Sequence, residues 1–416
     1  FLAKYDVLGS LAHTRMLQSI GLLTADELEC IQTELKRIFR TIEDGEFVIE
    51  PDVEDVHSQV ELLLTRALGD TGKKIHSGRS RNDQILVDLK LFARAEIRQI
   101  VDLTAQLIDV LLAQSNRYKD VLMPGYTHLQ VAMPSSFGLW FGAYAEALCD
   151  DLQLMLAAWR ITNRNPLGSA AGYGSSFPLN RQMTTDLLGF DSMNYNVVYA
   201  QMGRGKMERI VATALGGVAA TLSKMAFDVC LYNSQNFGFV KLPKEYTTGS
   251  SIMPHKKNPD VFELIRAKCN KIQAAPQEIM MVANNLPSGY FRDLQIIKEI
   301  FIPLFGELRQ SLEMTLQIVQ KIEVNKAILD NNCYDLMFSV EEVNRLALEG
   351  VPFRDAYKQV GIAIEKGEFV PQKTINHTHE GSMGNLCNEK IAELKTAVLK
   401  EFTFEKAEKA ERDLVK

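Results

Sequence analysis

The stretch Arg79–Met123, RSRNDQILVDLKLFARAEIRQIVDLTAQLIDVLLAQSNRYKDVLM, contains neither glycine nor proline. Within it, apolar side chains and one threonine recur near the period of an α-helix: Leu86, Leu89, Ile97, Ile100, Thr104, Leu107, Leu111 and Leu112. This spacing predicts one helix of roughly 30 residues that ends at the turn Pro124-Gly125. An uninterrupted helix of this length is typical of an elongated bundle.

Four further stretches are predicted to be long helices: Pro134–Asn163, Gly205–Asn236, Val261–Asn284 with Pro276 as a kink, and Leu294–Lys321. Small residues at the centre of the second let neighbouring helices approach closely: Gly216, Gly217, Ala219 and Ala220. Five such helices cannot bury all their apolar faces in a small domain. We therefore expect an elongated central bundle that continues into other subunits.

The two flanks of the bundle differ from it in helix length. Residues 1–78 carry shorter amphipathic segments, such as Ala25–Ile42 with Thr24 as its N-cap. After about Asn325 the helices are shorter and break at Gly350-Val351-Pro352. Alternation with a period of two is scarce, so the sequence predicts an all-α fold with three parts: residues 1–78, 79–325 and 326–416.

Composition narrows the class of protein. With 46 Lys and Arg against 52 Asp and Glu, the net charge of −6 argues against a nucleic-acid partner. The longest uncharged apolar stretch, Ile210–Ser223, is shorter than the ~20 residues of a membrane span. No leader is seen, and the six cysteines form no Cys-x-x-Cys pair. We therefore expect a cytoplasmic protein without a membrane partner.

Four polar segments at the ends of the long helices are candidates for function. The first is GKKIHSGRSRNDQ (residues 72–84), which has four cations and no acid before Asp83. It is either a solvated loop with a helix cap or an anion site, in which arginine and a helix N-terminus hold a carboxylate or phosphate.

The second segment is MPGYTHLQ (residues 123–130), which places His128 between Thr127 and Gln130. A lone histidine in a turn is structural more often than catalytic, and here the neighbouring polar groups make a ligand-orienting role equally plausible.

The third segment is TTGSSIMPHKKNP (residues 247–259), which contains no acidic residue. Gly249 and the paired serines suit a mobile surface loop. Its lysines suggest instead an activated serine, with Lys256 holding a developing anion. Glu263, early in the next helix, is placed to pair with a histidine from another segment.

The fourth segment, YFRDLQIIK (residues 290–298), is a weak signal on its own and is compatible with a solvated face. Together, however, the segments resemble a known family. GSSIMPHKKNP (residues 249–259) resembles the signature loop of the fumarase/aspartase superfamily. Four others resemble its argininosuccinate lyase and delta-crystallin branch: HSGRSRNDQ (76–84), PGYTHLQ (124–130), EDVHS (54–58) and VPFR (351–354).

This resemblance covers nearly the whole chain and implies a function. It implies a lyase that cleaves argininosuccinate to arginine and fumarate by β-elimination, the last step of arginine biosynthesis, with neither a metal nor an organic cofactor. It also implies a homotetramer in which three subunits build each active site. Members generally carry a further N-terminal segment with a substrate-binding serine, so we expect that part of the site to lie outside this sequence.

The resemblance also implies roles for individual residues. Ser250 matches the loop serine, His128 the catalytic histidine, and Glu263 its partner. Lys256 matches the lysine that faces the reacting carboxylate, and Arg81 lies in the same anion site. Further positions match substrate-binding residues: Asn82, Thr127, Asn258, Tyr290, Gln295 and Lys298. We favour Ser250 as base and the His128–Glu263 pair as acid, while the reverse assignment stays open.

Two departures from the family pattern leave alternatives open. The family usually has an acid on each side of Arg204, and here Gly203 and Gly205 stand there. The small-residue stretch at 166–172 is also altered. A modified substrate, such as an N-acylated argininosuccinate, is therefore one alternative. The others are a superfamily lyase for adenylosuccinate, aspartate or malate, and a non-catalytic, crystallin-like protein.

Overall fold

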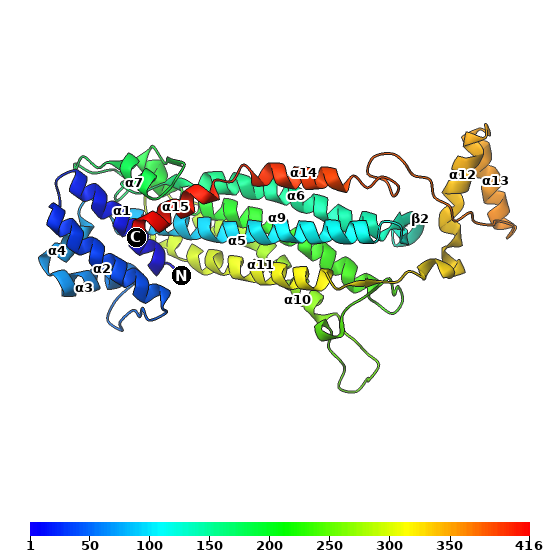
Figure 1. Ribbon diagram of the computed structural model, residues 1–416, viewed down its shortest axis with the longest axis horizontal. Coiled ribbons are helices and arrows are strands. Elements are labelled where there is room, and N and C mark those ends of the chain that lie inside the picture. The colour runs from blue at the N-terminus through cyan, green and yellow to red at the C-terminus, as the bar shows by residue number, and fades with distance from the viewer.

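The longest element of the computed structural model, which describes residues 1–416, is helix α5 (Arg81–Arg117). Its 37 residues span about 55 Å at 1.5 Å per residue, so this helix sets the length of the bundle (Figure 1). A capping box starts it: the Ser80 hydroxyl accepts from the Asn82 N–H, and the Asp83 carboxylate accepts from the Ser80 N–H.

The other four long helices also form close to the predicted bounds: α6 (Phe137–Thr162), α9 (Lys206–Tyr232), α10 (Asp260–Ala283) and α11 (Ile297–Val319). Helix α9 packs against α6, α10 and α11, and α5 packs against α6 and α11. Pro276 lies inside α10, which continues past it. The predicted bundle of five long helices and the all-α class are confirmed.

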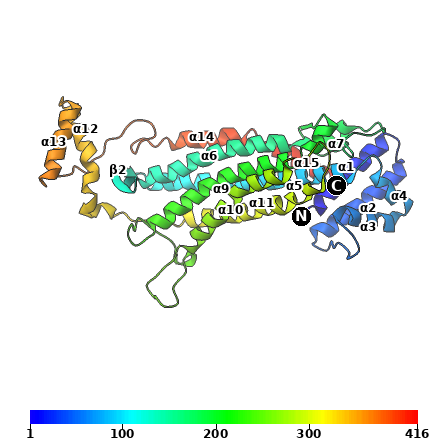
Figure 2. The same cartoon turned by 180° about the vertical axis from the view of Figure 1, so that it is seen from behind.

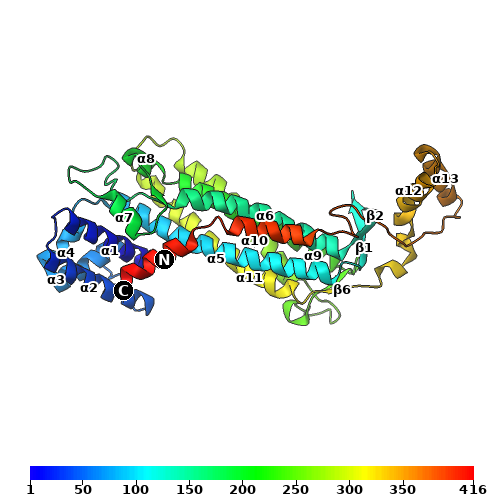
Figure 3. The ribbon, with the colours of Figure 1, turned by 45° about the horizontal axis from the view of Figure 1, so that its top comes forward.

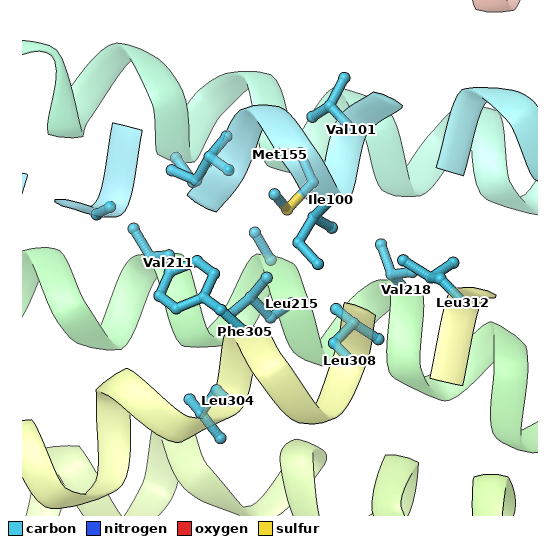
Figure 4. Packing of buried hydrophobic residues seen from close by; sticks show 14 of the residues in the cluster. Ile100, Val101, Met155, Val211, Leu215, Val218, Leu304, Phe305, Leu308 and Leu312 are labelled. Atoms are coloured by element: carbon cyan, nitrogen blue, oxygen red, sulfur yellow. The ribbon is translucent and has the colours of Figure 1, made fainter. Parts of the chain in front are cut away.

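The core of the bundle is formed by side chains from facing helices. Figure 4 shows Ile100 of α5, Met155 of α6, Leu215 of α9 and Phe305 of α11 converging on one another. Each of these four side chains is at most 1% exposed. By length and hydropathy α9 is the one helix that passes as a candidate membrane span. A buried core helix passes the same test, and α9 packs against α6, α10 and α11; Figure 2 shows it running between α6 and α10.

The predicted end of the first long helix was wrong. Helix α5 ends at Arg117, and Pro124 and Gly125 lie instead inside strand β1 (Leu122–Thr127). This strand pairs in antiparallel fashion with β2 (Gln130–Ser136). The pairing shifts register between Pro124 and Tyr126, where an irregularity accommodates the proline that has no N–H to donate. The remaining strands have two residues each: Arg164–Asn165, Ser192–Met193, Val240–Lys241 and Glu323–Val324.

Shorter helices cover the end of the bundle at which α5 begins: α1 (Ala3–Ser19), α2 (Ala25–Glu43), α3 (Val56–Leu68), α4 (Asp70–Lys73), α7 (Arg181–Leu187) and α8 (Val197–Met202). The predicted cap of α2 is confirmed, because Thr24 forms a capping box with Glu27. Short 3-10 turns lie at Lys74–His76, Lys244–Tyr246, Arg292–Gln295, Ile328–Asp330 and Asn332–Phe338.

Beyond the opposite end, α12 (Ser339–Leu348) and α13 (Phe353–Glu365) form a hairpin, and the predicted break between them is confirmed. These two helices have a small core of their own. Helices α14 (Asn388–Leu399) and α15 (Phe404–Val415) instead run back along the bundle and join its core (Figure 3). The division at residues 78 and 325 stays a prediction. The packing adds that α14 and α15 share the core of the bundle.

Candidate active site

Five of the predicted site residues line one cleft, which lies where α5, α9 and α11 begin. We call it the end cleft; it has a volume of about 150 Å³. The five come from the first turn of α5 and from the segment that leads into α11: Arg81, Asn82, Tyr290, Gln295 and Lys298. The weak fourth segment of the sequence is thus brought beside the first.

Hydrogen bonds within the chain fix several of these side chains. Arg81 donates to Glu61 at 2.7 Å and to Gln84 at 3.0 Å. The carboxylate of Glu61 neutralises the charge of Arg81. Gln295 donates its side-chain N–H to the Tyr290 hydroxyl at 2.9 Å. Lys298 has no carboxylate within 4.0 Å. Burial, together with the charge of Arg204, lowers the pKa of Lys298.

A buried charge cluster surrounds His57, which lines the end cleft. His57 Nδ1 lies 2.9 Å from Asp6 Oδ1 and 3.5 Å from Asp88 Oδ2. Burial and the charge of Asp6 raise the pKa of Asp88, while His57 and other neighbours hold the pKa of Asp6 below its usual range despite its burial. The three residues are close enough to share a metal ion. However, His57 and Gln84 both bond to Asp6 Oδ1, and the raised pKa of Asp88 disfavours the charged carboxylate that a cation would need.

The predicted catalytic histidine lies at the other end of α5. Thr127 and His128 are exposed in the turn between β1 and β2, and His128 has a φ of 54°. His128 borders a shallow hollow whose other walls include Phe227 and Leu231 of α9. Because α5 is about 55 Å long, one chain holds His128 far from Arg81 and Asn82.

The predicted catalytic loop projects from the side of the bundle (Figure 1). Its base is closed by Thr248 and Asn258, whose backbones exchange hydrogen bonds of 3.2 and 2.8 Å. The Ser250 hydroxyl accepts from the N–H groups of Ile252 and Met253, at 3.3 and 3.1 Å. Two N–H donors stabilise negative charge on the serine oxygen, and because the hydroxyl acts only as an acceptor here, they favour loss of its proton.

The remaining catalytic candidates are exposed. Lys256 lies in the same loop, and Glu263 lies in the first turn of α10. No hydrogen bond or ion pair joins Glu263 to His128 within the chain. The structure therefore places the predicted residues in three separate regions: the end cleft, the hairpin turn and the loop with the start of α10.

Three polar residues of the end cleft were not predicted as site residues: Asp55, His57 and Arg204. Signals for them were present. Asp55 and His57 lie in the EDVHS segment, and Arg204 is the arginine with a glycine on each side. Without the fold, however, nothing distinguishes an acid at the start of a helix or an arginine in a turn from ordinary surface charges.

Comparisons with known proteins identify the family. A sequence profile of the family described as Lyase matches residues 2–274. The argininosuccinate lyase of Parabacteroides distasonis is 69% identical over 415 residues, which cover 100% of this chain and 93% of that protein. The argininosuccinate lyase of Stenotrophomonas maltophilia is 43% identical over 358 residues, covering 85% and 82%.

Solved structures agree on the fold. A crystal structure of an EDDS lyase in complex with formate has a TM-score of 0.83 at 22% identity, covering 99% of this chain and 90% of that one. A class II fumarase from Schistosoma mansoni has a TM-score of 0.72 at 17% identity, covering 96% and 90%. These likenesses show the fold, and the sequence identities above show the family. The chain belongs to the argininosuccinate lyase family of lyases.

Proposed function

We propose that this protein cleaves argininosuccinate to arginine and fumarate by β-elimination, as the last step of arginine biosynthesis. The observation that carries this proposal is 69% identity with an argininosuccinate lyase along the full length of the chain. The residues that this chemistry needs are all present: Ser250, His128, Lys256 and Glu263. Their presence argues against a non-catalytic role.

The active site is assembled from several copies of the chain, which we propose form a homotetramer. The separation of about 55 Å along α5 supports this, because a single chain keeps His128 away from the end cleft. The exposure of His128, Lys256 and Glu263 supports it too, since catalysis of this kind needs a site shielded from water. We also place the protein in the cytoplasm, because its six cysteines are all free.

Elimination begins with loss of a weakly acidic proton from the carbon beside a carboxylate. The resulting negative charge spreads into that carboxylate, where Lys256 and Asn258 stabilise it by several kcal/mol. Ser250 is our preferred base, because two N–H groups already point at its oxygen. The His128–Glu263 pair then protonates the departing guanidino nitrogen.

The end cleft is proposed to hold the arginine half of the substrate. Polar contacts there come from Arg81, Asn82, Tyr290, Gln295 and Lys298, and Thr127 completes the set once the subunits assemble. Closure of the loop then excludes water and brings Ser250 to the reacting carbon.

The test is to incubate the assembled protein with argininosuccinate and to follow fumarate by its ultraviolet absorbance. We expect steady fumarate release with argininosuccinate, and none with adenylosuccinate, aspartate or malate. Turnover of one of those three compounds in preference to argininosuccinate would assign the chain to another lyase activity. The absence of fumarate in every case would contradict the proposal.

A further inference from the structure

One arginine in the end cleft has no role in the mechanism above. Arg204 lies in the turn between α8 and α9 and is 5% exposed. Gly205, with a φ of +80°, turns the chain into α9 and donates its N–H to Glu208 at 2.7 Å. Glu208 thus uses one carboxylate oxygen as the helix cap, and its other oxygen is buried without a partner; its charge acts on Arg204, but no ion pair within 4.0 Å joins the two.

The guanidinium of Arg204 borders the end cleft with unused donors. Its Nε and one of its terminal nitrogens are buried without a hydrogen-bond partner. The guanidinium carbon lies 5.6 Å from the centre of the Tyr290 ring, which contributes a cation–π contact but no counter-charge. Burial lowers the pKa of Arg204, as it does that of Lys298. Two cations without an ion pair thus border one cleft, and a carboxylate would satisfy both.

The end cleft also offers one unpaired carboxylate. Asp55 borders it and accepts a hydrogen bond of 2.7 Å from the Ser58 N–H. Burial alone would raise the pKa of Asp55, but this N–H and the charges of His57 and Arg81 hold it below its usual range. Asp55 is therefore ionised at neutral pH, and no cation lies within 4.0 Å of it. A ligand that carries an ammonium beside its carboxylate matches this pattern.

We infer that Arg204 and Asp55 determine substrate specificity by binding the two charged groups of a free α-amino acid. Arg204, with Lys298, binds the α-carboxylate of the substrate, and Asp55 binds its α-ammonium. This inference rests on the proposed function, because neither Ser250 nor His128 borders the end cleft and the half of the substrate held there is the one that leaves as arginine. An N-acylated substrate has no ammonium and would leave the half-buried Asp55 carboxylate beside an amide.

The inference is tested by the binding of product analogues to the full chain. L-Arginine, L-argininamide and Nα-acetyl-L-arginine are titrated by calorimetry into the wild type, Arg204→Gln and Asp55→Asn. The wild type should bind arginine at least about tenfold more tightly than either analogue, the scale of one charge-assisted hydrogen bond. Arg204→Gln should lose the preference over argininamide alone, and Asp55→Asn the preference over the acetyl derivative alone.

Several outcomes would overturn the inference. One is an Arg204→Gln protein that keeps the full preference for arginine over argininamide; another is a wild type that binds Nα-acetyl-L-arginine as tightly as arginine. If Arg204→Gln does not assemble, Arg204→Lys replaces it and should keep only part of the preference; full retention would overturn the inference. The binding series does not depend on turnover, so a failure of fumarate release remains distinguishable from a failure of this site.

Discussion

The end cleft differs from the predicted catalytic loop and the hairpin turn in whether its side chains are held by contacts within one chain. In the end cleft, Arg81, Tyr290 and Gln295 are fixed by hydrogen bonds within the chain. In the hairpin turn and in the loop, respectively, His128 and Lys256 are exposed and have no side-chain partner in the chain. A single chain thus fixes side chains of the end cleft by its own hydrogen bonds and leaves His128 and Lys256 exposed, which is the difference that the proposed homotetramer would explain.

The largest effect is expected on the turnover rate, from a change in the loop that leaves the end cleft intact. Ser250→Ala removes the proposed base and should lower kcat by at least about a thousandfold. Binding of arginine should be unchanged, because Ser250 does not border the end cleft. Ser251→Ala is the matched control, since its side chain is in the same loop but is exposed. Fumarate absorbance and calorimetry measure the two properties.

If Ser250→Ala keeps substantial activity, the loop serine has no chemical role, and His128 becomes the leading candidate for the base. If the variant loses arginine binding instead, the two regions are not separable in the way proposed.

A second prediction concerns the core that joins the two regions. Leu215 lies in the middle of α9 and is fully buried, so Leu215→Ala should reduce the free energy of unfolding by about 2–5 kcal/mol. Leu348→Ala is the matched control, because Leu348 is 90% exposed and should change stability little. Thermal unfolding followed by circular dichroism measures both. Equal losses for the two variants would mean that the bundle core does not carry the stability.

A third prediction concerns the loss of folding stability in acid, which should come in part from a buried histidine. Burial and the charge of Arg79 lower the pKa of His13, a fully buried residue of α1, to about 3. The unfolded chain takes up a proton below about pH 6.5 that the folded chain refuses, so stability is lost as pH falls from 6.5 towards 3. Between pH 6.5 and 5 the loss from this group should be about 2 kcal/mol.

His13→Gln should flatten this part of the stability profile, measured by urea unfolding at several pH values. His379→Gln serves as control, because His379 is exposed and its loss should leave the profile unchanged. A profile that is equally steep in His13→Gln would assign the acid sensitivity to another group.

The smallest effect is expected at two neighbouring glycines of α9. A Cβ on Gly216 would lie 3.8 Å from the Gln273 Cα, an ordinary contact, so Gly216→Ala should raise stability by up to about 1 kcal/mol. A Cβ on Gly217 would lie 2.9 Å from a carboxylate oxygen of Asp151, so Gly217→Ala should be less favourable. Thermal unfolding of the pair checks this order. The reverse order would mean that the close approach of helices is at Gly216.

Much of the fold could be predicted from the sequence, because the apolar period of each long helix persists without interruption. The end of α5 could not be predicted from Pro124-Gly125, since these residues serve equally well as a turn or as an irregular strand. The course of α14 and α15 also escaped prediction. Amphipathic helices of 12 residues fit many surfaces, and only the assembled core shows that they pack along the bundle.

The site was predictable where a motif is distinctive. Ser250, His128 and Lys256 lie in segments whose residue order resembles a family, although composition alone left each open to a structural explanation. Asp55 and Arg204 were missed because their meaning depends on the folded cleft, where Arg204 is buried with unpartnered nitrogens and Asp55 is half-buried without an ion pair. That property arises only when α3, α9 and α11 meet at the end of the bundle.

The most direct test of the shared site uses two variants that are each inactive. Ser250→Ala and Lys298→Met damage the loop and the end cleft, and the two chains are co-expressed so that mixed assemblies form. If the loop and the end cleft of one site come from different subunits, random mixing leaves both parts intact in about a quarter of the sites. Fumarate release should then return to about a quarter of the wild-type rate. No activity above that of the two parent variants would contradict a site shared between chains.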